Sequence, residues 1–189
     1  MPQVSARGKL VEHAEGVFRC KGFSGASVQD IAAAAEVPKG SFYNHFRSKK
    51  ELAAEIVRRY GAATEFGMLA GDASPVGRLR AHFVAQADRT RSTGVEFGCL
   101  LVTMASDAPT AGEEVRHAVR ETIEAWTDAL AAVIEEGRQT GEIRPGPSAR
   151  EVAAFLIDAF EGGALRGKAT EDDTASMRSL NLALDSLQR

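Results

Sequence analysis

The sequence has little cysteine, few aromatic residues and no long apolar run. Its 189 residues contain only Cys20 and Cys99, so a disulfide framework is not expected, and no His/Cys spacing resembles a zinc site. No run of about 18 apolar residues occurs, and the segment MPQVSARGKL lacks the apolar core of a signal peptide. We therefore expect a cytoplasmic protein that does not span a membrane and needs no metal or other cofactor.

Charge is distributed unevenly along the chain, although the total is only -3 at pH 7. Residues 1–60 carry 10 Lys/Arg against 6 Asp/Glu, whereas residues 61–189 carry 13 against 20. The whole chain does not resemble a nucleic-acid binder, but a basic first third on an acidic remainder fits an N-terminal module that meets phosphate groups.

The patterning is helical throughout. We find no sustained alternation of apolar and polar residues and no Asn-Gly or Asp-Gly turn. Instead, helix starts of the type Ser/Thr-x-x-acid recur. They occur at Ser48/Glu51, Thr110/Glu113, Ser148/Glu151, Ser27/Asp30 and Thr170/Asp173, and stops are expected at Gly22, Gly71 and Gly141. These marks predict helices over 5–21, 27–34, 38–45, 48–70, 75–92, 97–106, 111–139, 149–167 and 171–187.

The most informative stretch is SVQDIAAAAEVPKGSFYNHFRSKK, residues 27–50. It predicts a short helix, a tight turn around Ala35–Val37 and a second short helix that opens at Pro38, which suits a first helical position because it has no N–H to leave unbonded. Phe42 and Phe46 are four residues apart, so we expect them to fasten the second helix to its neighbours. Residues 39–50 contain four Lys/Arg and no acid.

The segment GFSGASVQDIAAAAEVPKGSFYNHFRSKKEL resembles the helix-turn-helix signature of the TetR family, over residues 10–60. The resemblance implies a homodimeric, sequence-specific transcriptional repressor that a small-molecule or electrophilic inducer releases from double-stranded operator DNA. It assigns base-edge contacts to Gln29, Lys39, Ser41 and Asn44, and phosphate contacts to Ser27, Tyr43, His45 and Lys49. Gly40 leaves the start of the second helix without a bulky side chain, so the backbone there can come close to DNA.

The expected fold is therefore all-α, with about nine helices. Residues 1–50 would form a three-helix, helix-turn-helix DNA-binding domain with a linking helix at 48–70, and residues 51–189 a helical ligand-sensing and dimerisation domain. The last two predicted helices carry wide apolar stripes, and the resemblance favours a four-helix dimer interface made from them. The expected interface residues are Phe155, Ala159, Gly163, Met177, Leu180, Leu184 and Leu187.

The remaining helices should enclose an inducer pocket, although ordinary core packing is the alternative for each candidate. The candidates are Phe66, Phe83, Gln86, Phe97, Cys99, Met104, Trp126, Phe155 and Lys168.

Cys99 has a further interpretation, because it lies near the start of a predicted helix, where the helix dipole favours a thiolate. FGCLLVTMAS resembles the Gly-Cys-Leu stretch of the NemR-like and AcuR-like subset, regulators associated with reactive electrophiles or acrylate-like ligands. Lys168 falls where that subset can carry a lysine able to approach the cysteine. The alternative is that Cys99 is a small buried hydrophobic residue.

Two other functions are alternatives to a repressor. A cysteine hydrolase could pair Cys99 with His13, His45, His82 or His117, but no nucleophile motif, Gly-rich phosphate loop or metal-ligand spacing is present, and we expect no enzymatic activity. A nonspecific architectural DNA binder would have little use for an acidic C-terminal region rich in apolar helix faces.

Overall fold

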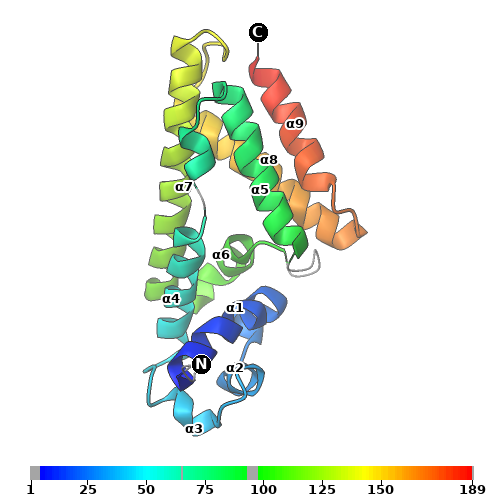
Figure 1. Cartoon of the computed structure of the whole chain (residues 1–189). Helices are drawn as coiled ribbons and strands as arrows, with labels where there is room; N and C mark the ends of the chain where they lie inside the picture. Colours follow the sequence, from blue (N-terminus) through cyan, green and yellow to red (C-terminus); the bar gives the residue numbers. More distant parts are fainter. Residues whose placement is uncertain (1–4, 65, 93–97, 189) are drawn as a thin grey trace. The chain divides into compact units, whose positions relative to one another are not determined.

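The computed structural model describes residues 5–64, 66–92 and 98–188, and in this part of the chain helices joined by short connections make up the fold (Figure 1). β-type pairing within it is limited to one isolated bridge between Ile143 and Gln188. The elements are α1 (Ala6–Gly25), α2 (Val28–Ala34), α3 (Lys39–Phe42), α4 (Lys49–Ala62), the 3-10 turn η1 (Gly67–Ala70), α5 (Pro75–Ser92), α6 (Leu100–Ala111), α7 (Glu113–Gln139), α8 (Ala149–Thr170) and α9 (Ala175–Leu187). The all-α prediction is confirmed. None of the described helices combines the length and the apolar character that crossing a bilayer requires.

The helices group into two compact units. Unit 1 contains Met1–Ala63 and Cys99–Thr122, and unit 2 contains Thr64–Gly98 and Ile123–Arg189. The expected boundary at residue 50 does not coincide with this division, because α4 and α6 group with the N-terminal helices.

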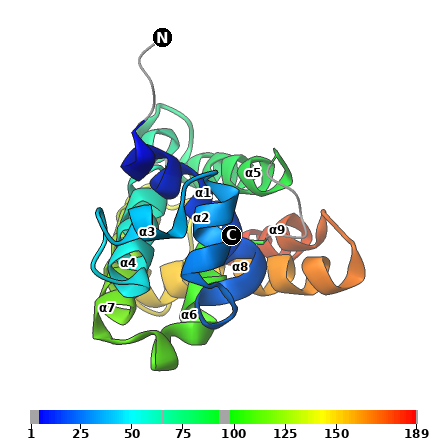
Figure 2. The ribbon, with the colours of Figure 1, turned by 90° about the horizontal axis from the view of Figure 1, so that it is seen from below.

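Unit 1 is built on a stripe of buried side chains along α1. Leu10, Ala14 and Phe18 are fully buried, as their i, i+4, i+8 spacing predicts. Phe42 is fully buried and Phe46 nearly so, and their rings lie 5.6 Å apart. Figure 2 shows α1, α2 and α3 of this unit from below. The two phenylalanines thus anchor the short α3 to a core that longer helices supply.

Three of the predicted helix starts are confirmed. Ser27 and Asp30 form a complete capping box at α2, and Ser148 and Glu151 form another at α8. The hydrogen bonds from Ser148 also lower the pKa of Glu151. Ser48 caps α4 by accepting from the N–H of Glu51. Each cap satisfies an N–H that the first turn of a helix leaves without a partner.

The other two predicted starts are wrong. Thr110 lies in the last turn of α6, where its hydroxyl donates to Asp107 O, and Thr170 is the last residue of α8. In both cases the preceding helix continues past the expected stop, and the threonine bonds back along it instead of capping the next helix.

Two other boundaries also differ. The predicted helix 48–70 ends at Ala62, just after Gly61, and Gly71 follows only the 3-10 turn η1. Glycine weakens a helix, so Gly61 favours an end nearby. Gly22 adopts the expected positive φ, +69°, but it kinks α1 rather than ending it. Gly141, with φ +78°, follows α7 as predicted.

Unit 2 has an aromatic core and a close helix pair. Phe83 lies 5.8 Å from Trp126 and 5.1 Å from Phe160, between ring centroids, and Trp126 Nε1 donates to His82 Nε2 at 2.8 Å. α8 and α9 lie side by side (Figure 1). They approach so closely that a Cβ on Gly163 would lie 2.7 Å from the carbonyl oxygen of Ala175.

Candidate nucleic-acid interface

α2 and α3 form the predicted helix-turn-helix. After α2, Ala35 N–H donates to Ile31 O and Val37 N–H donates to Ala32 O, while Glu36 adopts a left-handed φ of 53°. The chain then turns into α3 at Pro38, whose φ of -58° suits a helix start. The regular part of α3 is shorter than predicted, and residues 43–45 continue it as turns. The motif is a compact corner with one buried and one exposed side.

The exposed side carries most of the residues expected to meet DNA. Tyr43 is 60% exposed, and Lys39, Asn44 and His45 are also exposed, whereas Ser41 is half-buried. Gln29 on α2 and Gly40 on α3 are exposed as well, and a Cβ on Gly40 would meet nothing within 4 Å. Polar and basic groups therefore face outward on short elements whose phenylalanines point inward.

Ser27 is exposed but already engaged at the start of α2. Its hydroxyl donates to Asp30 Oδ2 at 2.6 Å, and Lys21 Nζ lies 2.6 Å from Asp30 Oδ1. The hydrogen bonds from Lys21 and Ser27 hold the pKa of Asp30 well below its usual range. This ionised network fixes where α2 begins.

Lys49 does not lie where a phosphate contact would require. Its ammonium does not extend from the surface as a phosphate contact would, but donates to Phe23 O and Ala26 O, both at 2.6 Å, and lies 4.2 Å from the centroid of the Phe23 ring. Burial lowers the pKa of Lys49. The carbonyls at the end of α1 attract the charge inward, a partner that the local sequence pattern does not reveal.

Of the residues predicted to form the dimer interface on α8 and α9, only Phe155 is exposed. Leu180 and Leu184 are fully buried within the subunit, and Gly163 packs against α9, so these three residues are not available to a second copy. Their stripe faces the core because α8 and α5 cover it. Phe155 is exposed as expected, whereas Ala159, Met177 and Leu187 are half-buried.

Sequence reasoning missed two exposed apolar residues on these helices, Leu165 at 59% and Leu182 at 71% exposure. Leu182 is two residues from Leu180 and Leu184, which places it on nearly the opposite side of a helix that turns about 100° per residue. A large apolar residue off the core stripe was the available signal.

The predicted pocket residues are divided between the two units. Phe83, Gln86 and Trp126 are buried in unit 2, where Phe66 also stacks on His82 with ring centroids 5.9 Å apart. Met104 is fully buried on α6 in unit 1, and Lys168 is exposed. Phe97 lies outside the described residues.

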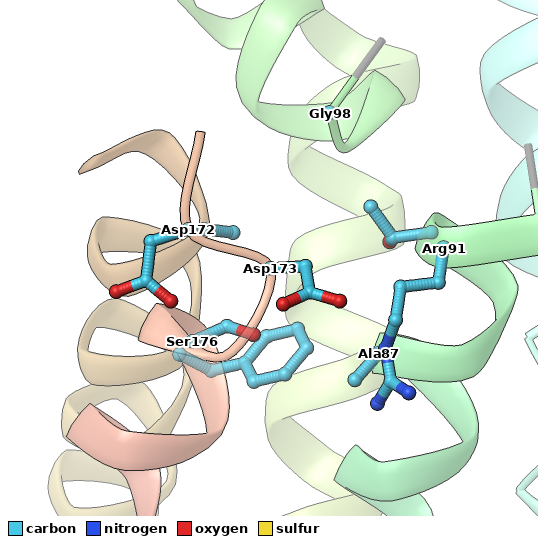
Figure 3. Close-up of a pocket in the computed structure, with 9 residues that line it drawn as sticks. Ala87, Arg91, Gly98, Asp172, Asp173 and Ser176 are labelled. Carbon is cyan, nitrogen blue, oxygen red and sulfur yellow. The ribbon is translucent and has the colours of Figure 1, made fainter. Parts of the chain in front are cut away.

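A small cavity and a surface groove lie within the described part of unit 2. The first has a volume of about 20 Å³ and lies between α5 and the α8–α9 connection; Figure 3 shows Asp172 and Asp173 on one side and Arg91 on the other. It has room for about one water molecule. The second is a surface groove of about 390 Å³, lined among others by Arg138, Arg144 and Phe155. Ligand pockets usually measure about 300–1,000 Å³, so of these two the groove has the size for a small molecule.

Cys99 is the N-cap of α6, as its predicted place near a helix start implied. It is 8% exposed, and the Tyr60 hydroxyl donates to its sulfur at 3.6 Å. In unit 2, the aliphatic stem of Lys168 lies close to Gly98: a Cβ added at Gly98 would be 3.6 Å from Lys168 Cδ. Cys20, by contrast, is exposed.

Comparison with known proteins agrees with this geometry. The family "Bacterial regulatory proteins, tetR family" matches residues 10–56, and "Tetracyclin repressor-like, C-terminal domain" matches residues 75–183. The chain belongs to the TetR family. The second match includes α6, which the structure groups with the DNA-binding helices of this TetR-family chain.

Individual relatives support the same assignment. The chain is 36% identical to the HTH-type transcriptional repressor DhaR of Mycobacterium sp. (strain GP1) over 172 residues, which cover 89% of this chain and 85% of DhaR. It is 28% identical to the repressor NemR of Escherichia coli K12 over 138 residues, or 70% of this chain and 69% of NemR. A TetR-family regulator from Agrobacterium tumefaciens shares the fold with a TM-score of 0.88 at 23% identity, covering 97% and 98% of the two chains. The expected family and its DNA-binding regulatory function are confirmed.

Proposed function

We propose that this protein is a homodimeric, sequence-specific repressor that binds operator DNA through α2 and α3 and is released by a small-molecule or electrophilic inducer. The observation that carries the proposal is the exposed polar side of the helix-turn-helix, backed by the buried Phe42 and Phe46. Relatives named as transcriptional repressors, DhaR and NemR among them, support repression as the direction of control.

In this proposal Gln29, Lys39, Ser41 and Asn44 meet base edges, Gly40 allows close backbone approach, and Ser27, Tyr43 and His45 meet phosphates. Base contacts select sequence and phosphate contacts set register, so the two groups have separable effects. Lys49 is not among the proposed contacts, because its ammonium is engaged by two carbonyls of its own unit.

The test begins with selection of preferred duplexes from a randomised pool, with and without competitor DNA. We expect one preferred sequence that survives competition; a nonspecific architectural binder would yield none. Asn44→Ala should then change which duplex variants are preferred, whereas Arg120→Gln, at an exposed position on α7, should not. An Asn44→Ala protein with the wild-type preference would contradict the assignment of base contacts.

Dimerisation is proposed through the outer surface of α8 and α9. TetR-family repressors act as dimers, and a two-fold dimer presents two recognition elements to successive major grooves. Phe155, Leu165 and Leu182 are the exposed large apolar side chains of these two helices. Covering them removes apolar surface from water, and this supports their place in the contact.

Cys99 is proposed as the site where an electrophile acts. Three observations support it: its position at the N-cap of a twelve-residue helix, its contact with Tyr60 and its low exposure, so that an adduct must displace packed atoms. The experiment compares duplex binding by wild type, Cys99→Ser and Cys20→Ser after treatment with N-ethylmaleimide. Wild type and Cys20→Ser should lose affinity together. If Cys99→Ser loses it equally, or if mass spectrometry finds Cys99 unmodified in the native protein, a noncovalent inducer is the better explanation.

A further inference from the structure

The end of α1 has a constrained backbone. Gly22 has φ +69° and ψ 178°, so the chain kinks there and then runs through Phe23–Ala26 to Ser27, the N-cap of α2. Only glycine adopts this φ readily. A Cβ at Gly22 would in addition lie 2.6 Å from Asp107 Oδ2 on α6. At this kink the backbone of α1 therefore lies against a side chain about 85 residues away in sequence.

α6 holds the segment after the kink from one side. Asp107 Oδ2 accepts from the backbone N–H of Ser24 at 3.1 Å, and the hydroxyls of Ser24 and Thr110 lie 3.3 Å apart. Hydrogen bonds to an ionised acceptor are stronger than those between neutral groups.

α4 holds the same segment through the carbonyl groups. Lys49 Nζ donates to Phe23 O and Ala26 O, the residues on either side of the Ser24–Gly25 pair. Burial lowers the pKa of Lys49, and the charge of Asp107 acts in the opposite direction, so the two ionised groups support each other. In the segment Phe23–Ala26, one backbone amide is thus bound by Asp107 of α6 and two carbonyls are bound by Lys49 of α4.

We infer that Asp107 is a positioning residue for operator recognition: with Lys49 it clamps Phe23–Ala26 and thereby sets the direction in which α2 begins. The inference rests on the proposed DNA-binding function and adds a control point to it. Asp107 belongs to the segment matched by the C-terminal family domain, yet α6 groups with the DNA-binding helices. The same helix begins at Cys99, about 12 Å of helix from Asp107. A shift of α6 caused at its N-cap would loosen the clamp at its other end.

The test measures binding to a duplex that the wild-type protein selects from a randomised pool. Asp107→Ala should weaken binding at least tenfold with an unchanged salt slope, because no phosphate contact is lost. Asp107→Asn keeps a hydrogen-bond acceptor but loses the charge. Its affinity for the duplex should fall about threefold, because a hydrogen bond to a neutral acceptor is weaker. Ser106→Ala is the matched control: it is the adjacent exposed position, its hydroxyl donates back to Val102 O, and binding should stay within twofold.

Amide hydrogen exchange of the free dimer gives a second measurement that does not depend on DNA. The Ser24 amide should exchange at least tenfold faster in Asp107→Ala than in wild type, while the amides of α7 keep their protection. Binding within twofold of wild type, or unchanged Ser24 exchange, overturns the clamp, and so does a general loss of protection, since Asp107 would then only stabilise the fold. If wild type selects no preferred duplex but Ser24 exchange responds, the proposed function fails and the clamp stands.

Discussion

The helix-turn-helix in unit 1 and the α8–α9 pair in unit 2 use apolar residues in opposite ways. In the helix-turn-helix the large apolar side chains Phe42 and Phe46 are buried, and polar and basic groups are exposed beside Tyr43. In α8 and α9 the core already holds Leu180 and Leu184, yet Phe155 and Leu182 remain exposed. The first surface suits a charged, hydrated partner, whereas the second is suited to an apolar one.

Binding through the two surfaces should therefore respond differently to salt. Binding through Lys/Arg to phosphate releases counterions and weakens steeply with salt. Association through apolar side chains follows the area removed from water and depends little on ionic strength. Variants on the two surfaces should therefore be distinguishable by the property they change.

The largest effect is expected from Phe155→Glu combined with Leu182→Glu. Two charges on the outer side of α8 and α9 should prevent dimerisation, and duplex binding should fall more than a hundredfold because the two recognition elements are no longer linked. Sedimentation velocity measures the first effect and fluorescence anisotropy the second. Val84→Glu, at an exposed apolar position on α5, is the control and should remain dimeric. A double variant that still sediments as a dimer would place the interface elsewhere.

The next largest effect concerns the two sides of α8 at adjacent glycines. Gly163→Ala should lower the free energy of unfolding by about 1–3 kcal/mol, because the new methyl group meets α9 backbone that cannot yield easily. Gly162→Ala, with no atom within 4 Å of the added Cβ, should leave stability unchanged or raise it by up to about 1 kcal/mol. Thermal unfolding at one fixed protein concentration measures both. Equal destabilisation would mean that the outer side of α8 is as closely packed in the dimer as its inner side.

Lys39 and Lys49 offer a smaller contrast within unit 1. Lys49→Gln should lower the free energy of unfolding by about 1–2 kcal/mol, through loss of a charged hydrogen-bond donor, and leave the salt slope of DNA binding unchanged. Lys39→Gln should preserve stability and change which duplex variants are preferred, because Lys39 is proposed to contact base edges. Chemical denaturation, salt titrations and binding to duplex variants separate the two. A stable Lys49→Gln protein with a reduced slope would restore the phosphate contact that the sequence predicts.

The smallest effect is expected at the α8–α9 turn. Hydrogen bonds from Thr174 and Arg178 lower the pKa of Asp172 from 3.8 to about 2. The ionised carboxylate therefore stabilises the turn above its unfolded pKa, and this contribution disappears as pH falls from 3.8 to about 2. Melting temperatures across this range should fall more steeply for wild type than for Asp172→Asn, with Asp173→Asn as the adjacent control. Parallel curves for wild type and Asp172→Asn would show that the turn does not depend on the charge.

Local patterns predicted a large part of this molecule. The capping boxes at Ser27 and Ser148, the turn before Pro38 and the buried Phe42 and Phe46 depend on residues within a few positions of each other. Their spacing is enough because helix geometry brings such neighbours together wherever the helix lies. The same holds for Cys99 at the start of α6.

Longer-range choices could not be predicted in this way. An apolar stripe shows that a helix has a face to bury, but Leu180 and Leu165 are chemically alike, and only the packing of α8 on α9 decided which is covered. The motif assigns Lys49 to a phosphate contact, yet its ammonium donates hydrogen bonds to the carbonyls of Phe23 and Ala26, 26 and 23 residues away. Sequence alone therefore determined the all-α fold, the helix caps at Ser27, Ser48 and Ser148, and the family. The tertiary structure decided which helix faces remain exposed and which charged groups are paired. These depend on contacts between residues far apart in the sequence, which helical periodicity does not relate.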